Sequence, residues 1–221
     1  MYRKLCIAVL VLCFVASIAQ AGIVDVVKRP QPTIESNLQV GSLAYFDRTA
    51  VTNPPGGHQY VQIPTWLLGV DYVRVGNDDK SNKLYQLDVT VDEACTLFLL
   101  IDNRIGDGNK DNGPTLTTYM PWVAALGFVD TDPAGQPSTN RTYDIGIDES
   151  GNNVPFGSAD NWFSIFSKDV LPGTTTFGTA WWGPAGSNRP QDNNMYTVAI
   201  PEPATIALLG FGALSLLRRR K

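Results

Sequence analysis

Three oxygen-bearing side chains at alternate positions form the part of the chain best suited to bind a metal. Asp107, Asn109 and Asp111 lie in a loop rich in Asp, Asn and Gly, and they match the first half of an EF-hand-like calcium loop. The second half differs, because Asn112 replaces the expected Gly and Thr118 replaces the bidentate Glu. We therefore expect no required cofactor and treat calcium as a candidate ligand. A plain surface turn, which uses the same residue types, is the alternative.

Residues for acid, base or nucleophilic catalysis are sparse. His58 is the one histidine of the chain and follows Pro54-Pro-Gly-Gly, so we expect a solvated loop histidine. The sequence contains no Gly-x-Ser-x-Gly turn for a nucleophilic serine, and one His with few Cys gives no zinc ligand set. A polysaccharide hydrolase needs two carboxylates across a cleft, and no pair stands out in the sequence. We predict that the protein is not an enzyme.

Tryptophan offers a different kind of site, a flat surface on which a sugar ring can stack. The chain has five tryptophans, most of which we expect in the core. Trp181 and Trp182 are neighbours, and neighbouring residues of a strand point to opposite faces of a sheet. Burial of one therefore favours exposure of the other, next to a Gly-Pro loop. We predict Trp181 or Trp182 as a candidate glycan contact.

The pattern of apolar residues between these positions is that of strands. Tyr85, Leu87, Val89 and Val91 alternate with polar residues, which predicts a strand with one buried face. The segment from Thr96 to Ile101 is apolar throughout and predicts a central strand covered on both sides, with Cys95 buried as a small apolar residue. Further predicted strands are 41–46, 70–75, 122–129, 141–147, 162–166, 174–182 and 195–200.

Turn-rich segments separate these strands, and no long helical period occurs between them. We predict an all-β fold, a single antiparallel β-sandwich domain of the jelly-roll kind over residues 41–200, after an entry linker and first strand at 22–40. The passage from Tyr72 through Asp102-Asn-Arg104 loosely resembles the galactose-binding-like sandwiches of carbohydrate-binding modules. That resemblance implies extracellular polysaccharide as a candidate partner.

The N-terminus has the features of an export signal. Arg3 and Lys4 precede an apolar run from Leu5 to Ile18, and Ala19 and Ala21 form a small-x-small cleavage site. We predict a signal peptide at residues 1–21, cleaved after Ala21.

Removal of this signal peptide and of the C-terminal residues 201–221 changes the charge balance. The chain has 17 Lys and Arg and 21 Asp and Glu, and the two segments take six of the basic residues and one of the acidic ones. The remaining domain therefore carries a formal charge of about −9. Such a surface repels polyanions, so we expect no nucleic acid partner.

The C-terminal segment, residues 201–221, has three parts. Pro201, Glu202 and Pro203 precede an uncharged apolar run from Ala204 to Leu217, and the chain ends with Arg218, Arg219, Arg220 and Lys221. The prolines oppose a helix at their own positions, and the cations resist translocation across a membrane. As a helix, the apolar run would reach ~21 Å, short of the ~30 Å hydrocarbon core. The pattern predicts a short transmembrane helix, with transient or permanent membrane association.

This order of parts resembles the PEP-CTERM sorting signal of exported bacterial proteins. The resemblance covers about the last tenth of the chain and implies processing near Pro201-Glu202-Pro203 by an exosortase-type membrane protease. An ordinary short membrane anchor is the alternative. The resemblance implies a location in the cell envelope or extracellular matrix, with tethering to the membrane before processing.

Taken together, the sequence predicts an exported cell-surface or extracellular-matrix protein, most simply a non-catalytic structural or interaction module. The alternative is a glycan-binding β-sandwich module assisted by calcium, and a third class is a polysaccharide hydrolase.

Overall fold

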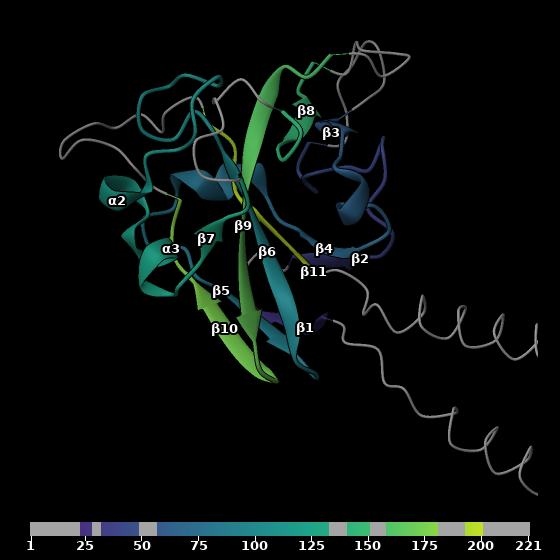
Figure 1. The fold of residues 1–221 in the computed structure, drawn as a ribbon, viewed down its shortest axis with the longest axis vertical. Coiled ribbons are helices and arrows are strands. Elements are labelled where there is room, and N and C mark those ends of the chain that lie inside the picture. The colour runs from purple at the N-terminus through teal and green to yellow at the C-terminus, as the bar shows by residue number, and fades with distance from the viewer. Residues whose placement is uncertain are drawn as a thin grey trace, which may run out of the picture.

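The protein is an all-β, antiparallel sandwich, as the sequence predicts. The computed structural model describes residues 23–27, 32–48, 57–132, 141–150, 158–180 and 193–200. A three-stranded sheet has the order β1-β5-β10, and an eight-stranded sheet has the order β2-β4-β11-β6-β9-β8-β3, with β7 also paired to β9. Figure 1 shows β6 and β9 side by side through the middle of the molecule. The strands are β1 (Ile23–Val27), β2 (Thr33–Glu35), β3 (Gln59–Gln62), β4 (Asp71–Arg74), β5 (Leu87–Val91), β6 (Cys95–Asp102), β7 (Val129–Asp130), β8 (Ile145–Asp148), β9 (Asn161–Val170), β10 (Gly173–Phe177) and β11 (Thr197–Ile200).

The small sheet buries one face, as its alternating sequence requires. Leu87, Val89 and Val91 of β5 are buried, while Asp88 and Thr90 lie on the outer face. The outer face is held by side chains across the strands, with Thr176 donating to Asp88 at 2.6 Å. The inner face packs on the large sheet to form a single core.

Strand β6 is the centre of the large sheet. It pairs with β9 over its whole length and with β11 on its other side. Leu99, Leu100 and Ile101 are fully buried, so both faces of β6 are covered here, as predicted. The short 3₁₀ helix η1 (Thr65–Leu67) contributes to the cover, because the Trp66 ring lies 5.1 Å from that of Phe98.

The large sheet curls so strongly that β3, at one edge, faces β4 and β11 from the opposite half of the sheet. Tyr60 of β3 lies edge-on to Tyr72 of β4 at 6.0 Å, and its hydroxyl donates to Thr197 Oγ1 of β11 at 3.1 Å. The segment that contains Leu43 and Tyr45 connects the two halves through isolated bridges. Leu43 pairs with Gln59 of β3, and Tyr45 pairs with Val75, just after β4. The predicted strand at 41–46 is therefore wrong: the segment makes isolated bridges and single backbone hydrogen bonds, such as Gly41 N to Tyr60 O at 2.8 Å, but no continuous ladder.

The predicted strand at 122–129 is also wrong, because its first half is helical and a turn follows. Pro121 occupies the first turn of α3 (Pro121–Ala125), where its missing N–H costs nothing, and Gly127 ends the helical path with φ of +84°. Only Val129 joins a strand, β7. Helix α2 (Leu116–Tyr119) precedes α3, and both lie to one side of the sandwich (Figure 1). Among the described residues, no helix has the length and apolar character needed to cross a membrane.

Several other boundaries shift relative to the predictions. Strand β8 begins at Ile145 rather than 141, β9 extends to Val170, and β10 ends at Phe177. The segment at 22–40, predicted as an entry linker and first strand, contributes β1 to the small sheet and β2 to the large sheet. A second 3₁₀ helix, η2 (Asn77–Ser81), follows β4.

Candidate functional site

A cluster of buried and half-buried polar side chains lies at the end of β6, just after β8 and just before β11. Asp102 ends β6 and is completely buried. Arg104 Nη2 donates to Asp102 Oδ2 and to Glu149 Oε1, both at 2.7 Å, and Arg104 Nε donates to Asp102 Oδ1 at 3.0 Å. Glu149 follows the last residue of β8. One guanidinium therefore joins two carboxylates from neighbouring parts of the sheet.

The same cluster fixes the start of β11. Asn194 N donates to Asp102 Oδ2 at 2.6 Å, and Asn194 Nδ2 donates to Glu149 Oε1. Asn77, at the start of η2, donates to Asn194 Oδ1 at 3.0 Å and accepts from Met195 N at 2.9 Å. These four bonds join residues at least 45 positions apart in sequence, whereas Asp102 and Arg104 are only two positions apart. We call Asn77, Asp102, Arg104, Glu149 and Asn194 the buried network.

Burial dominates the electrostatics of the buried network. It raises the pKa of Asp102 above its ordinary value, although hydrogen bonds and charge from Arg104 act in the opposite direction. Burial lowers the pKa of Arg104, but its bonds to Asp102 and the charges of Asp102 and Glu149 outweigh that effect and raise it. The arginine therefore stays cationic and compensates both carboxylates.

A second polar cluster lies beside the first, around Arg141. Its Nη1 donates to Asp144 Oδ2 at 2.6 Å, its Nη2 donates to Asp111 Oδ1 at 2.8 Å, and its guanidinium lies 4.9 Å from the Trp162 ring centroid. Burial raises the pKa of Asp144 to about 6 despite this contact. Asn103, which lies between Asp102 and Arg104 in the sequence, donates to Asp144 Oδ2 at 3.2 Å. This bond links the two clusters.

The predicted calcium loop is held by its own hydrogen bonds. Asp107 Oδ1 accepts from Asn109 N at 2.8 Å, and its Oδ2 accepts from Asn112 Nδ2 at 2.7 Å. Asn109 Oδ1 accepts from Asp111 N at 3.0 Å, while Asp111 pairs with Arg141. A calcium ion would compete with these donors. Across the described ranges, no group of three His, Cys, Asp or Glu is placed to hold a metal ion. Calcium binding by Asp107, Asn109 and Asp111 stays a prediction.

His58 is packed rather than solvated, contrary to expectation. Its ring lies edge-on to Tyr45 at 5.7 Å, and its Nδ1 is buried without a hydrogen-bond partner among the described residues. Burial lowers its pKa to about 4, and the nearby charges of Arg48 and Lys80 act in the same direction. The neutral imidazole is therefore the form that the fold accommodates.

This packing predicts that acid destabilises the domain through His58. The unfolded histidine has a pKa near 6.5, so the unfolded state takes up the proton first as the pH falls. The contribution of His58 to stability is complete above pH ~6.5 and is lost as the pH falls to about 4. We expect a loss of roughly 1–2 kcal/mol over this range after solvent screening, and His58→Gln should remove that component. Urea unfolding of both proteins at several pH values measures it. Parallel pH profiles for the two would contradict it.

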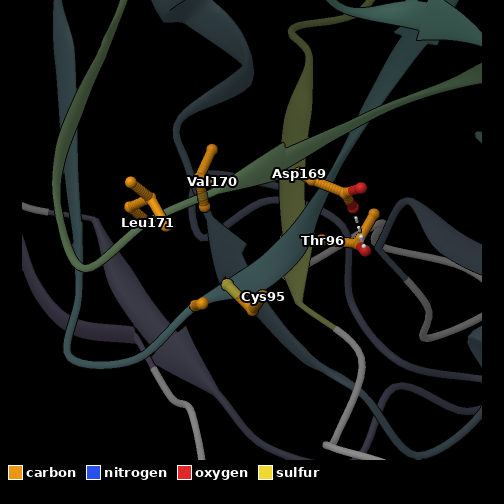
Figure 2. Close-up of a pocket in the computed structure, with 6 residues that line it drawn as sticks. Cys95, Thr96, Asp169, Val170 and Leu171 are labelled. Atoms are coloured by element: carbon orange, nitrogen blue, oxygen red, sulfur yellow. Dashed lines mark hydrogen bonds between the residues drawn. The ribbon is translucent and has the colours of Figure 1, made fainter.

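An open pocket lies at the opposite end of β6 from the buried network. Its volume is about 390 Å³, and it is lined by Ala94, Cys95, Thr96, Asp169, Val170 and Leu171. Figure 2 shows the Cys95 side chain beside Thr96, which donates to Asp169 at 2.7 Å. Cys95 is half-buried, not enclosed as predicted, because it starts the strand instead of lying within it. Burial raises the pKa of its thiol, and Asp92 and Asp169 add to the shift, so the thiol is protonated at neutral pH.

Several predicted site residues lie outside the described residues. They are the signal cleavage positions Ala19 and Ala21, the candidate glycan contacts Trp181 and Trp182, and the sorting residues Pro201, Glu202, Pro203, Arg218, Arg219 and Arg220. Glycan contact by Trp181 or Trp182 stays a prediction.

The structure does describe the residues that lead into the C-terminal segment. Ala199 and Ile200 belong to β11 and pair with Tyr72 and Asp71 of β4. Neither residue exposes more than 1% of its surface. A central strand of the large sheet therefore ends immediately before Pro201. Comparison with known families matches residues 199–221 to the PEP-CTERM protein-sorting motif. The chain carries a PEP-CTERM sorting signal. This motif marks an exported protein and implies exosortase, a membrane protease, as a partner.

The other comparisons add little to the sorting motif. No curated protein matches the chain. A solved structure described as a beta-glucuronidase from glycoside hydrolase family 2 is 16% identical, with a TM-score of 0.46. The match covers 83% of this chain but 14% of that one.

Sequence reasoning missed most of the buried network. In the sequence, Asp102 and Arg104 stand out only as the end of the galactose-binding-like passage, and Glu149 and Asn194 lie in turn-like sequence with no distinguishing pattern. The available signal was weak: acidic and amide residues that directly adjoin predicted strands, where side chains of different strands converge.

Proposed function

We propose that the protein is a non-catalytic structural or interaction module of the cell surface or extracellular matrix. Its PEP-CTERM tail inserts in the membrane and tethers the sandwich until an exosortase-type protease processes it. The observation that carries this proposal is the direct continuation of β11 into the sorting motif. The folded domain and its sorting signal are thus adjoining parts of one unit.

The buried network supports a structural role. A glycosidase needs one carboxylate free to donate a proton and another free to act as base or nucleophile. Asp102 and Glu149, the carboxylates that converge at this site, are both bonded to Arg104 and to Asn194. Their side chains fix loops and strand ends, which is what a stable extracellular module requires.

Replacement of the Pro-Glu-Pro tests the sorting proposal. We expect Pro201→Ala, Glu202→Ala and Pro203→Ala together to abolish the processed form, because the protease loses its recognition residues. The unprocessed chain should then accumulate in the membrane fraction. Intact mass of the protein recovered from membrane and surface fractions measures both outcomes.

A charge-conserving change supplies the matched control for this experiment. Arg219→Lys keeps a cation at the terminus, so processing and surface location should match the unaltered protein. Processing that continues normally in the triple variant would contradict the proposal.

A further inference from the structure

The first described strand begins, and the last one ends, at the same end of the sandwich. Ile200 ends β11 opposite Asp71, the first residue of β4. Ile23 begins β1 opposite Val91, the last residue of β5. From Val91 a short turn leads to Cys95 at the start of β6. Cys95 in turn pairs with Val170 at the end of β9. We call this the exit end, defined by Ile23, Asp71, Val91, Cys95, Val170 and Ile200.

The connection between the exit end and the apolar tail is very short. Ile200 is held in the sheet by β4, and the apolar run begins at Ala204. Four residues of extended chain reach at most ~14 Å. Strand β6, by comparison, spans ~23 Å from Cys95 to Asp102. With the tail inserted, the domain cannot turn over without detaching β11.

We propose that the exit end of the sandwich faces the lipid surface while the tail is inserted, and that the short connection imposes this orientation. The proposal rests on the membrane-tethering role proposed above. The buried network and the Asp107–Asp111 loop then point away from the membrane, because they lie beyond the other end of β6.

Exposed apolar side chains near the exit end fit this orientation. Leu171, next to Val170, is 79% exposed, and Leu68, just before Asp71, is 46% exposed. Trp66 is 41% exposed, and its ring packs at a tilt against that of Phe98. Tryptophan is enriched at membrane interfaces, where an apolar ring with a polar N–H suits both lipid and water.

The charge of the same end argues that the tail, rather than the domain surface, provides the attachment. Asp71, Asp92, Glu93 and Asp169 all lie at or beside the exit end, with Lys168 nearby. These carboxylates repel anionic lipid. A domain freed from its tail should therefore leave the membrane.

Site-selective fluorescence quenching tests the orientation. The chain from residue 22 to 221 retains every described strand and has Cys95 as its single thiol. A fluorophore on Cys95 reports the exit end. Its matched control is Cys95→Ser combined with Gly113→Cys, because a Cβ at Gly113 would meet nothing closer than Ser164 Oγ at 3.9 Å, beside the far end of β6. Equal circular dichroism and melting midpoints check that both proteins fold.

Both labelled proteins are bound to vesicles of phosphatidylethanolamine and phosphatidylglycerol that contain a lipid with a spin-labelled headgroup. We expect the label at Cys95 to be quenched roughly twofold or more relative to the label at Gly113→Cys, given their separation of ~20 Å along β6. Equal quenching, or stronger quenching at position 113, would overturn the proposal.

A flexible spacer separates the role of the short connection from that of the tail itself. A Gly-Ser insert of about 30 residues between Ile200 and Pro201 gives a mean reach of ~30 Å. The chain with the insert should still float with the vesicles, but the difference between the two labels should fall at least by half. An unchanged difference would overturn the claim that the connection sets the orientation.

Flotation distinguishes this proposal from the tethering role. The chain 22–221 should float with the vesicles, and the same chain ended at Ile200 should not. If 22–221 stays in the aqueous fraction, the tethering role fails. If it floats with equal quenching of both labels, only the orientation fails.

Discussion

A chain that ends at Tyr196 will not fold, whereas a chain that ends at Ile200 will. The shorter chain lacks β11, which lies between β4 and β6 in the large sheet. Val198 and Ile200 are almost completely buried, and burial of each is worth ~1.5–3 kcal/mol. Loss of β11 also exposes the backbone donors and acceptors of two neighbouring strands. Domains of this kind are stable by only ~5–15 kcal/mol, so the loss removes most of that margin.

Thermal unfolding followed by near-ultraviolet circular dichroism distinguishes the two chains. The chain ended at Ile200 should show a cooperative transition, and the chain ended at Tyr196 should show none. A cooperative transition at a similar temperature in both would mean that β11 is dispensable. The result also limits where the protease can cut, because cleavage on the N-terminal side of Ile200 would remove part of the core.

Replacement of Arg104 should be the most damaging single substitution in the buried network. Arg104→Met keeps an unbranched apolar stem but removes the guanidinium, which leaves Asp102, completely buried, and Glu149 without their cation. Loss of one partner from a buried ion pair costs ~3–5 kcal/mol. In a domain of this size that lowers the melting temperature by roughly 10 °C.

Arg48→Met is the matched control, because Arg48 pairs with Asp78, whose side chain is 77% exposed. That surface pair contributes at most ~1 kcal/mol. The pH dependence gives a second signature: burial raises the pKa of Asp102, and protonation relieves its unpaired charge. The deficit of Arg104→Met should therefore shrink as the pH falls through that raised pKa. Equal melting temperatures for the two variants would contradict the role of Arg104 as the cation that compensates Asp102.

Local patterns predicted the strands whose burial is set by simple alternation or by continuous apolar sequence. The alternation in Tyr85–Val91 corresponds to β5, and the apolar run at Thr96–Ile101 corresponds to β6. The same reasoning failed at Trp122, where Pro121 and Gly127 favour a short helix within an apolar run. It failed again at Leu43 and Tyr45, since their bridges depend on the curl of the large sheet.

The polar contacts were less accessible to prediction than the strands. Asn77 and Asn194 meet only because β11 inserts next to β4, a pairing between residues more than a hundred positions apart. No local rule encodes such a pair. The sorting signal was predictable for the opposite reason, because its three parts are contiguous and their order alone identifies them.

The strand order has a consequence for secretion. A polypeptide that crosses a translocation channel from its N-terminus delivers β4 and β6 long before β11, which must come between them. The large sheet therefore stays incomplete, with its middle unfilled, until the final residues before the sorting signal emerge. The large sheet can therefore close on the far side of the membrane only after β11 has crossed, and β11 ends directly before Pro201.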